Sequence, residues 1–465
     1  MTNRSERVAI MLADLGYGDA GKGATIDALA EKYHAHTVVR YNGGAQAAHT
    51  VTTPDGLVHT FAQFGSATLI PGVATYLSEY MLVDPLALES EEGYLHSIGV
   101  GDAFERLAVD GDALLVTPFA RAANRLREFM RDGERHGSCG MGVGESAVRA
   151  KGNPTQAPRV KDLLHPEELR QKIKQQQIEI REEFSPFVEA FLEGSAMAKD
   201  EWSLLNDPSA LDQVILRFIA ISKKFQITDE EWARTLFERP GVILFEGAQG
   251  VLLDEKFGFH PYTTWSNTTF ANAEALLDKF NFDGQKVRLG VLRAYATRHG
   301  PGPFVSESRE LTELLPDMHN VFNEWQRDFR IGWFDAVATR YALRVVGGVD
   351  GLVLTNIDRL FSLREWRFAD MYDVGNDKTF RDIPFDPAPS DASQEKLTQL
   401  LFAAKPVYKV LNVDTHMQRS LIEGSHPLFA EIERLLGVSV VLIGHGPSRT
   451  QKHWRGDIVS QPGAI

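Results

Sequence analysis

The chain is poor in cysteine and has no long apolar run. Cys139 is the one cysteine in 465 residues, which excludes an internal disulfide and a zinc site built from cysteines. No stretch of about 18 apolar residues occurs, so we expect no membrane-spanning segment. The first residues also lack the long apolar core of a signal peptide. These absences predict a cytoplasmic protein with no membrane partner.

Basic residues are outnumbered by acidic ones, 49 against 63, so the formal net charge is −14. Duplex nucleic acid requires a basic face to neutralise its phosphates, so this balance argues against nucleic acid as a partner. A nucleotide requires only a local pocket of cationic side chains and backbone amides. The composition therefore leaves phosphorylated small molecules open as ligands.

Short β-branched runs alternate with helical segments along the chain. This pattern predicts an α/β fold with a large, mostly parallel sheet and helices on both faces. We expect a single domain over residues 1–465, with a helical insertion at 161–235 and a long proline-containing loop at 374–394. The expected strands are Val8–Leu12, Thr37–Arg40, Val242–Phe245, Val287–Leu292, Gly351–Leu354 and Val438–Ile443.

The stretch Gly16–Gly23 joins the first expected strand to a helix-like segment. Its spacing Gly16-x4-Gly21-Lys22 fits a phosphate-binding loop, but Gly23 replaces the Ser or Thr whose hydroxyl binds Mg²⁺. Asp19, inside the loop, is then the candidate metal ligand. The alternative is an ordinary glycine turn with a solvated aspartate.

Three further stretches carry polar residues at the ends of expected strands. His49 follows Gly43-Gly44 beyond the second strand, on the sheet edge where open α/β folds bind ligands. The second stretch, Phe245–Gly250, is a strand followed by a glycine turn, and amides and hydroxyls follow it at 262–269. Asp358, after the strand Gly351–Leu354, has the acceptor geometry to bind the N1–H and 2-amino edge of guanine. Each signal alone also fits turn or capping chemistry.

Together these stretches resemble the adenylosuccinate synthetase family, GTP-dependent ligases that join aspartate to IMP. The loop 16–23 is similar to the family's Trp-Gly-Asp-Glu-Gly-Lys-Gly, and 39–50 to its Val-Arg-Tyr-x-Gly-Gly-x-Asn-Ala-Gly-His-Thr. Residues 245–254 keep Phe-Glu-Gly-Ala-Gln-Gly-x-Leu-Leu-Asp. Further matches lie at 266–269, 294–304, 332–335 and 446–450, so the resemblance spans nearly the whole chain.

The resemblance implies Asp19 as the general base, His49 as the acid and Lys22 as the group that stabilises the transferring phosphoryl charge. It implies Mg²⁺ held by Asp19 and the backbone carbonyl of Ala48, and a homodimer. The nucleoside triphosphate is expected at Gly18, Gly21, Lys22, Gly23, Asn356, Asp358, Gly444 and Gly446. The purine monophosphate is expected at Gln46, Ser138, Cys139, Arg149, Gln249, Thr264 and Arg327.

The chain departs from the family where the amino donor binds. The aligned positions are Glu324, Trp325, Arg327 and Arg330, and an acidic residue is electrostatically wrong for a dicarboxylate such as aspartate. We therefore expect a related ligase acting on IMP or another purine monophosphate such as dGMP, with GTP or ATP, and with aspartate or another amine. The alternatives are a catalytically inactive nucleotide-binding regulator of the same fold and a true P-loop NTPase.

Overall fold

The computed structural model describes residues 7–131, 138–315, 329–413 and 417–459. The chain separates into two compact units. The first unit comprises Met1–His36, His49–Thr60 and Arg239–Ile465, and the second comprises Thr37–Ala48 and Phe61–Glu238. The polypeptide passes between the units more than once, because the short segment 37–48 belongs to the second unit and 49–60 to the first.

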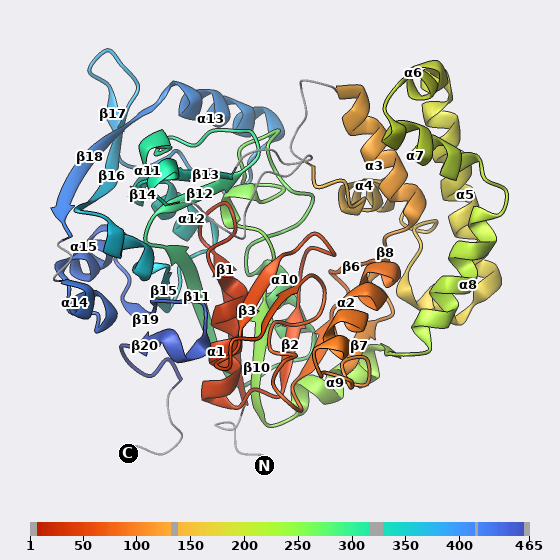
Figure 1. Cartoon of the computed structure of the whole chain (residues 1–465), viewed down its shortest axis with the longest axis horizontal. Coiled ribbons are helices and arrows are strands. Elements are labelled where there is room, and N and C mark those ends of the chain that lie inside the picture. The colour runs from red at the N-terminus through yellow and green to blue at the C-terminus, as the bar shows by residue number, and fades with distance from the viewer. Residues whose placement is uncertain (1–6, 132–137, 316–328, 414–416, 460–465) are drawn as a thin grey trace. The chain divides into compact units, whose positions relative to one another are not determined.

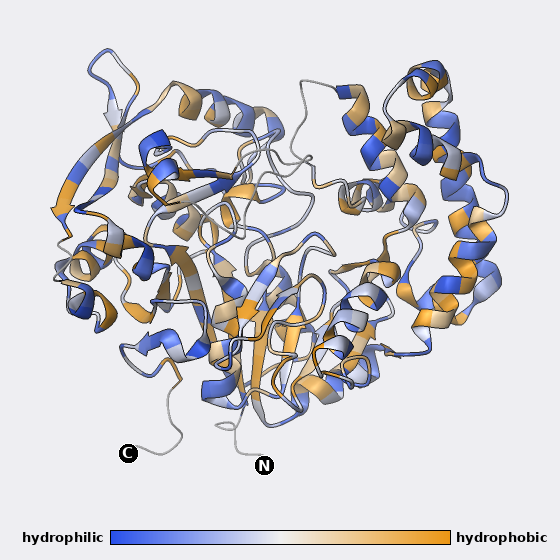
Figure 2. Cartoon of the chain, viewed as in Figure 1, coloured by the Kyte–Doolittle hydropathy of each residue, from blue (hydrophilic) through white to orange (hydrophobic). Residues whose placement is uncertain are grey.

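The first unit is built on sheet strands that include β1 (Arg7–Asp14). Parallel neighbours flank it on both sides, β10 (Gly241–Glu246) and β11 (Gln285–Arg293). The sheet continues from β11 through β15 (Gly351–Thr355) and β19 (Val440–Gly444), both parallel, and ends at the antiparallel β20 (Lys452–Trp454). The parallel strands among these are mostly buried, and Figure 2 shows that they are largely hydrophobic. Continuous burial is typical of parallel sheets.

Helices and smaller sheets complete the first unit (Figure 1). The helices are α1 (Lys22–Tyr33), α10 (Ala271–Lys279), α11 (Arg309–Leu314), α12 (Ala336–Val345), α13 (Asp391–Ala403), α14 (Gln418–Ile422) and α15 (Pro427–Leu436). The further strands are β3 (His49–Thr52), β4 (Val58–Phe61), β12 (Ala296–His299), β13 (Phe329–Gly332), β14 (Phe334–Asp335), β16 (Glu365–Asp373), β17 (Thr379–Phe380) and β18 (Lys405–Asn412). Strands β12 and β13 form an antiparallel ribbon, and β14, β17 and β18 all pair with β16.

The second unit contains four parallel strands that neighbour one another in the order β2 (Thr37–Arg40), β5 (Ala74–Leu77), β7 (Leu107–Asp110) and β9 (Gln226–Thr228). A short parallel pair, β6 (Leu82–Val83) and β8 (Leu114–Leu115), lies in the same unit. The helices are α2 (Pro85–Ser97), α3 (Pro118–Arg131), α4 (Val143–Gly152), α5 (Pro166–Phe184), α6 (Val188–Glu193), α7 (Ala196–Asn206), α8 (Ala210–Ser222) and α9 (Glu230–Glu238).

The α/β fold class and the mostly parallel sheet are confirmed. All six expected strands are present, within one or two residues of their predicted bounds. The expected loop at 374–394 is wrong in part, because it contains β17 and the start of α13. Phe380 of β17 packs edge-on against Tyr372 at a ring distance of 5.5 Å, and the Ser390 side chain caps α13 by accepting from the Ser393 amide.

The segment 161–235 contains helices α5 to α8, the first part of α9 and the strand β9. Its interpretation as an insertion within a single domain stays a prediction. Among the described residues, no helix has the length and apolar character needed to cross a bilayer.

Candidate active site

The glycine loop lies where β1 ends and α1 begins. Three of its residues have positive φ, Gly18 at 98°, Asp19 at 60° and Gly21 at 84°. Gly21 also provides the left-handed N-cap of α1. Left-handed residues interspersed in a turn direct successive backbone N–H groups to one side, and the helix N-terminus adds a partial positive charge there. The loop therefore has the geometry of an anion-binding turn.

Lys22, the first residue of α1, is buried and paired. Its Nζ lies 2.9 Å from Oδ2 of Asp14, the last residue of β1. The same carboxylate accepts from the amides of Gly16 and Ala20, each at 2.9 Å. Asp14 thus lies inside the loop and holds its shape, a role that sequence analysis missed.

Gly23 is explained by the packing of His49. A Cβ on Gly23 would lie 2.9 Å from the His49 Cβ and 3.1 Å from its carbonyl carbon. A Ser or Thr at this position, as in a P-loop NTPase, would collide with that backbone. The departure from the Walker pattern therefore creates the space that brings His49 against the first turn of α1.

His49 is held by a carboxylate at its other side. Its Nδ1 lies 2.5 Å from Oε1 of Glu246, at the end of β10, and the two side chains are 7% and 0% exposed. A carboxylate on Nδ1 keeps the proton on that nitrogen, fixes the ring orientation and stabilises the imidazolium form. The pair has the arrangement of a general acid with its orienting group.

The turn after β10 contacts the glycine loop directly. A Cβ on Gly250 would lie 2.2 Å from the Gly16 carbonyl oxygen and 2.3 Å from the Gly18 amide nitrogen. The Leu252 amide donates to that same carbonyl at 3.0 Å. Gln249 adopts a positive φ of 57°, and its Oε1 is buried without a hydrogen-bond partner among the described residues. An unpaired buried acceptor is costly, so this amide is suited to a ligand.

Asp19, the candidate base, lies beside a histidine and an arginine. Oδ2 of Asp19 is 3.4 Å from Nε2 of His299, at the end of β12. The His299 ring packs on Phe329 of β13 at 4.7 Å, and Nε of Arg293 donates to the Asp19 carbonyl at 2.5 Å. The left-handed backbone of Asp19 is therefore fixed from the β11 side, and its carboxylate is 27% exposed. Sequence analysis did not identify His299 or Arg293.

Comparison with known proteins decides the family of this site. The family model described as adenylosuccinate synthetase matches residues 11–453. The chain belongs to the adenylosuccinate synthetase family. Adenylosuccinate synthetases of Mycobacterium bovis and Mycobacterium leprae are 31% and 32% identical over 469 aligned residues, covering 97% of this chain and 99% of each relative. Family members are ligases that form a carbon–nitrogen bond in purine biosynthesis, and this chain is an enzyme of that class.

Two solved structures share the fold. The fully ligated adenylosuccinate synthetase of Plasmodium falciparum superposes with a TM-score of 0.77 at 21% identity, covering 96% of this chain and 99% of that one. The succinoaminodeoxyadenylate synthetase of cyanophage S-2L, solved with dGMP and with dATP as energy donor, has a TM-score of 0.58 at 15% identity, covering 97% and 96%. The adenylosuccinate synthetase fold therefore extends over nearly the whole chain.

The residues expected to bind the triphosphate base lie beyond β15 and β19. Asn356 adopts a positive φ of 57° and starts the 3₁₀ helix Ile357–Ser362, which includes Asp358. Nζ of Lys452 donates to the Gly446 carbonyl at 2.7 Å and lies 3.6 Å from where a Gly444 Cβ would be. Burial lowers the pKa of Lys452 to about 8, although the carboxylates of Asp27 and Asp358 oppose this. The half-buried Lys452 ammonium therefore lies near enough to interact with the Asp358 carboxylate.

Several expected monophosphate ligands lie in the second unit. Oε1 of Gln46 is buried without a hydrogen-bond partner among the described residues, and Ala48 is exposed. The Ser138 hydroxyl donates to Asn124 at 3.0 Å, and Cys139 is half-buried. Arg149 pairs with Glu183 at 2.6 Å and with Glu145 at 3.6 Å. Arg149 is thus engaged within its own unit, and ligand binding would have to compete with two carboxylates.

The remaining expected residues are in the first unit. Thr264 is half-buried, and its amide donates to the Leu253 carbonyl at 2.8 Å. Arg330 pairs with Glu307 at 2.8 Å and donates to the carbonyls of Gly300 and Gly302. It therefore holds the turn after β12. Glu324, Trp325 and Arg327 lie outside the described residues.

A cavity of about 50 Å³ lies beneath the glycine loop. Its polar lining includes Asp14, Tyr17, Arg293, Asp335 and Thr339. This volume is enough for bound water. Asp335 caps α12 by accepting from the Ala338 amide at 3.0 Å, and accepts from the Tyr372 hydroxyl at 2.5 Å.

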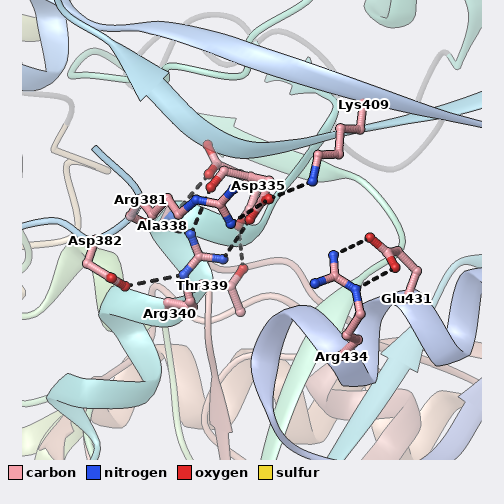
Figure 3. A network of polar contacts seen from close by, with 10 residues as sticks. Asp335, Ala338, Thr339, Arg340, Arg381, Asp382, Lys409, Glu431 and Arg434 are labelled. Carbon is pink, nitrogen blue, oxygen red and sulfur yellow. Dashed lines mark hydrogen bonds and ion pairs between the residues drawn. The ribbon is translucent and has the colours of Figure 1, made fainter. Parts of the chain in front are cut away.

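A network of polar contacts fixes the helix α12 that closes this cavity (Figure 3). Arg340 reaches Asp370 at 3.4 Å and Asp382 at 3.3 Å. Arg381 and Lys409 each contact the same Asp370 carboxylate at 3.0 Å. Burial alone would raise the pKa of Asp370, but Lys409, Arg381 and Arg340 outweigh this effect, and the pKa is lowered. The network ties α12 to β16 and β18, and so positions Asp335 and Thr339 beside the loop.

Proposed function

We propose that this enzyme uses a nucleoside triphosphate to phosphorylate the 6-oxygen of a purine nucleoside monophosphate, and then replaces that phosphate with an amine. The observation that carries the proposal is the packing of the His49–Glu246 pair against α1, directly after the glycine loop that holds Asp19 and Lys22. This arrangement brings a general acid beside an anion-binding turn that contains a candidate base. Such a set suits a reaction that makes an oxygen first a nucleophile and then a leaving group.

In the first step, the Asp19 carboxylate accepts the N1 proton of the 6-oxopurine. The 6-oxygen forms a bond to the γ-phosphorus as the bond to the β,γ-bridging oxygen breaks, and the nucleoside diphosphate leaves. His49 donates a hydrogen bond from Nε2 to the 6-oxygen, because Glu246 keeps the other ring proton on Nδ1. Lys22 and the loop amides stabilise the charge on the transferring phosphoryl group.

In the second step, the amine nitrogen bonds to C6 and loses one proton to the departing phosphate, the bond from C6 to oxygen breaks, and inorganic phosphate leaves. The proton on His49 and the loop donors now stabilise the departing phosphate oxygen. The same residues therefore serve both steps, which is consistent with one small, largely buried set of polar groups.

We further propose Mg²⁺ as the metal. No cluster of three or more histidine, cysteine or carboxylate side chains that would hold a metal occurs among the described residues. Mg²⁺ in nucleotide enzymes is bound through one or two protein oxygens together with substrate phosphates, and the partly exposed Asp19 carboxylate suits this role. The family resemblance implies the Ala48 carbonyl as the second protein ligand. When bound, the metal neutralises phosphate charge. We also propose a cytoplasmic homodimer.

The substrates are proposed as classes. The unpaired buried oxygen of Gln249 in the first unit supports binding of a group with an amide or hydroxyl donor, and so, separately, does that of Gln46 in the second unit. IMP and dGMP are both candidates, and the cyanophage enzyme solved with dGMP and dATP is the reason to include deoxynucleotides. Asp358 favours GTP over ATP, because adenine lacks the N1–H and 2-amino donors that a carboxylate binds.

The test measures phosphate release with Mg²⁺, GTP, IMP and aspartate, omitting each in turn while the ultraviolet spectrum of the purine is followed. Dependence on all four with a spectral shift supports aspartate ligation to IMP. Release that requires a purine monophosphate but ignores aspartate directs the test to dGMP, ATP and other amines. Nucleotide binding without phosphate release from any combination would support the inactive regulator and overturn the proposal.

A further inference from the structure

The Asp14 carboxylate is an anion within the chain that binds the donors of the glycine loop. Its carboxylate accepts from the Gly16 amide, the Ala20 amide and the Lys22 ammonium, each at 2.9 Å. The Asp14 side chain is 0% exposed and that of Lys22 is 3% exposed. These contacts satisfy both carboxylate oxygens and neutralise the lysine. The loop is therefore held around an internal negative charge.

The donors that Asp14 uses are the kinds that a phosphate-binding loop presents to its ligand. Backbone N–H groups of a glycine turn and the lysine at the start of the following helix bind phosphate oxygens. Lys22 has one ammonium group on a long, flexible chain, so it can contact Asp14 or reach toward a ligand. A buried ion pair also becomes costly when one partner leaves, because the other charge remains desolvated.

We propose that Asp14 is a built-in competitor of the nucleotide phosphate for Lys22, and that it lowers the affinity of the loop for the triphosphate. Lys22 exchanges between the Asp14 carboxylate in the free enzyme and a phosphate oxygen in the complex. Asp14 retains its two amide donors throughout, so the loop keeps its shape while the lysine moves. This inference rests on the proposed function, since it requires that the loop bind a nucleotide phosphate.

The direction of the change in the Kd for the triphosphate distinguishes competition by Asp14 from simple positioning of Lys22. In Asp14→Asn, the side-chain nitrogen cannot accept a hydrogen bond. The asparagine therefore cannot accept from the Lys22 ammonium and from both backbone amides as the carboxylate does. If Asp14 competes, Lys22 is freed, and the Kd for the triphosphate falls. If Asp14 only positions Lys22 for the ligand, the Kd rises. A charge-assisted hydrogen bond of this kind corresponds to a change of about tenfold to a hundredfold.

The experiment measures binding of GTP, ATP and inorganic tripolyphosphate to the full chain by isothermal titration calorimetry. Asp14→Ala is included because it removes the competing acceptor without introducing a new donor. The matched control is Asp162→Asn, since buried Asp162 accepts from the Lys172 ammonium at 2.8 Å and from the Arg159 amide at 2.7 Å in the second unit. Melting temperatures verify that each variant is folded.

The expected result is a Kd for tripolyphosphate and for the preferred nucleotide at least about tenfold lower in both Asp14 variants, with Asp162→Asn unchanged. An unchanged or higher Kd in the folded Asp14 variants overturns the competition. Failure of the proposed function is a different result, in which the wild-type chain binds nucleotide but releases no phosphate with any substrate set. If wild-type binding is undetectable, a gain of binding in the Asp14 variants supports the inference, and no gain overturns it.

Discussion

Replacing Glu246 with glutamine tests whether the carboxylate on His49 contributes to turnover. The substitution keeps the volume and one hydrogen-bond acceptor but removes the charge. The contact from Glu246 Oε1 to His49 Nδ1 is 2.5 Å, and neither side chain is more than 7% exposed. Because the pair is screened from water, the imidazolium that His49 needs for its proposed role as an acid relies on this carboxylate.

The magnitude follows from the strength of that contact. A hydrogen bond to a charged group contributes about 1.5–3 kcal/mol, which corresponds to roughly a 10- to 150-fold loss of kcat when it acts in the transition state. The KM values should change little, since Glu246 is not expected to touch the substrates. The assay is steady-state phosphate release, with kcat and KM measured for each substrate in turn.

Glu91→Gln provides the control for losing a buried carboxylate elsewhere. Glu91 accepts from the amides of Ala62 and Gln63 at 2.9 and 2.8 Å in the second unit. We expect this variant to lose stability but to retain kcat. A folded Glu246→Gln enzyme with kcat within about twofold of wild type would refute the acid role that we assign to the His49 pair.

Three further changes have defined outcomes. Gly23→Ser should reduce kcat and lower the melting temperature by an amount corresponding to about 1–3 kcal/mol, because its Cβ would lie 2.9 Å from that of His49. The control Gly93→Ser has open space around it and should not affect kcat. Burial raises the pKa of Asp27 to about 6 despite an opposing arginine, so stability from this group is lost as pH rises from about 4 to 6. Asp27→Asn should therefore gain roughly 3 kcal/mol over wild type between pH 4 and pH 7 in urea unfolding. Lys452→Met should lower kcat/KM for GTP about tenfold and leave ATP unaffected, and GTP use by the wild type should decline above pH 8 as Lys452, whose pKa is about 8, loses its proton. Equal losses for GTP and ATP would show that Lys452 does not contribute to discrimination between the two bases.

The sheet and its edge could be predicted from the chain alone. Parallel strands covered by helices are buried continuously, so their apolar runs stand out from the flanking polar residues. The glycine loop and His49 were predictable for a related reason, because short glycine-containing segments directly follow those runs. Thr37–Arg40 was predicted with its exact bounds, and β1 within two residues.

The partners of these residues were not predictable in the same way. Glu246 and His49 are 197 positions apart, and their contact depends on β10 lying beside β1 in a register that places Glu246 level with Leu12. His299 reaches Asp19 from a ribbon whose pairing no local pattern indicates. Asp14 lies two residues beyond the predicted end of the first strand and was not identified, because nothing in the spacing shows that the loop folds back over its carboxylate.

The contact of Gly250 with the glycine loop limits how this enzyme can be re-engineered. The atoms that a Cβ at position 250 would meet, the Gly16 oxygen and the Gly18 nitrogen, belong to the main chain. No exchange of side chains at 16 or 18 can therefore compensate for a larger residue at 250. Chimeras that combine segments of related synthetases should retain compatible backbones at 16–18 and 247–250 as one inherited block, although more than 200 residues separate them along the gene. Libraries aimed at new nucleotide substrates have more freedom at positions that meet their neighbours through side chains, such as 452.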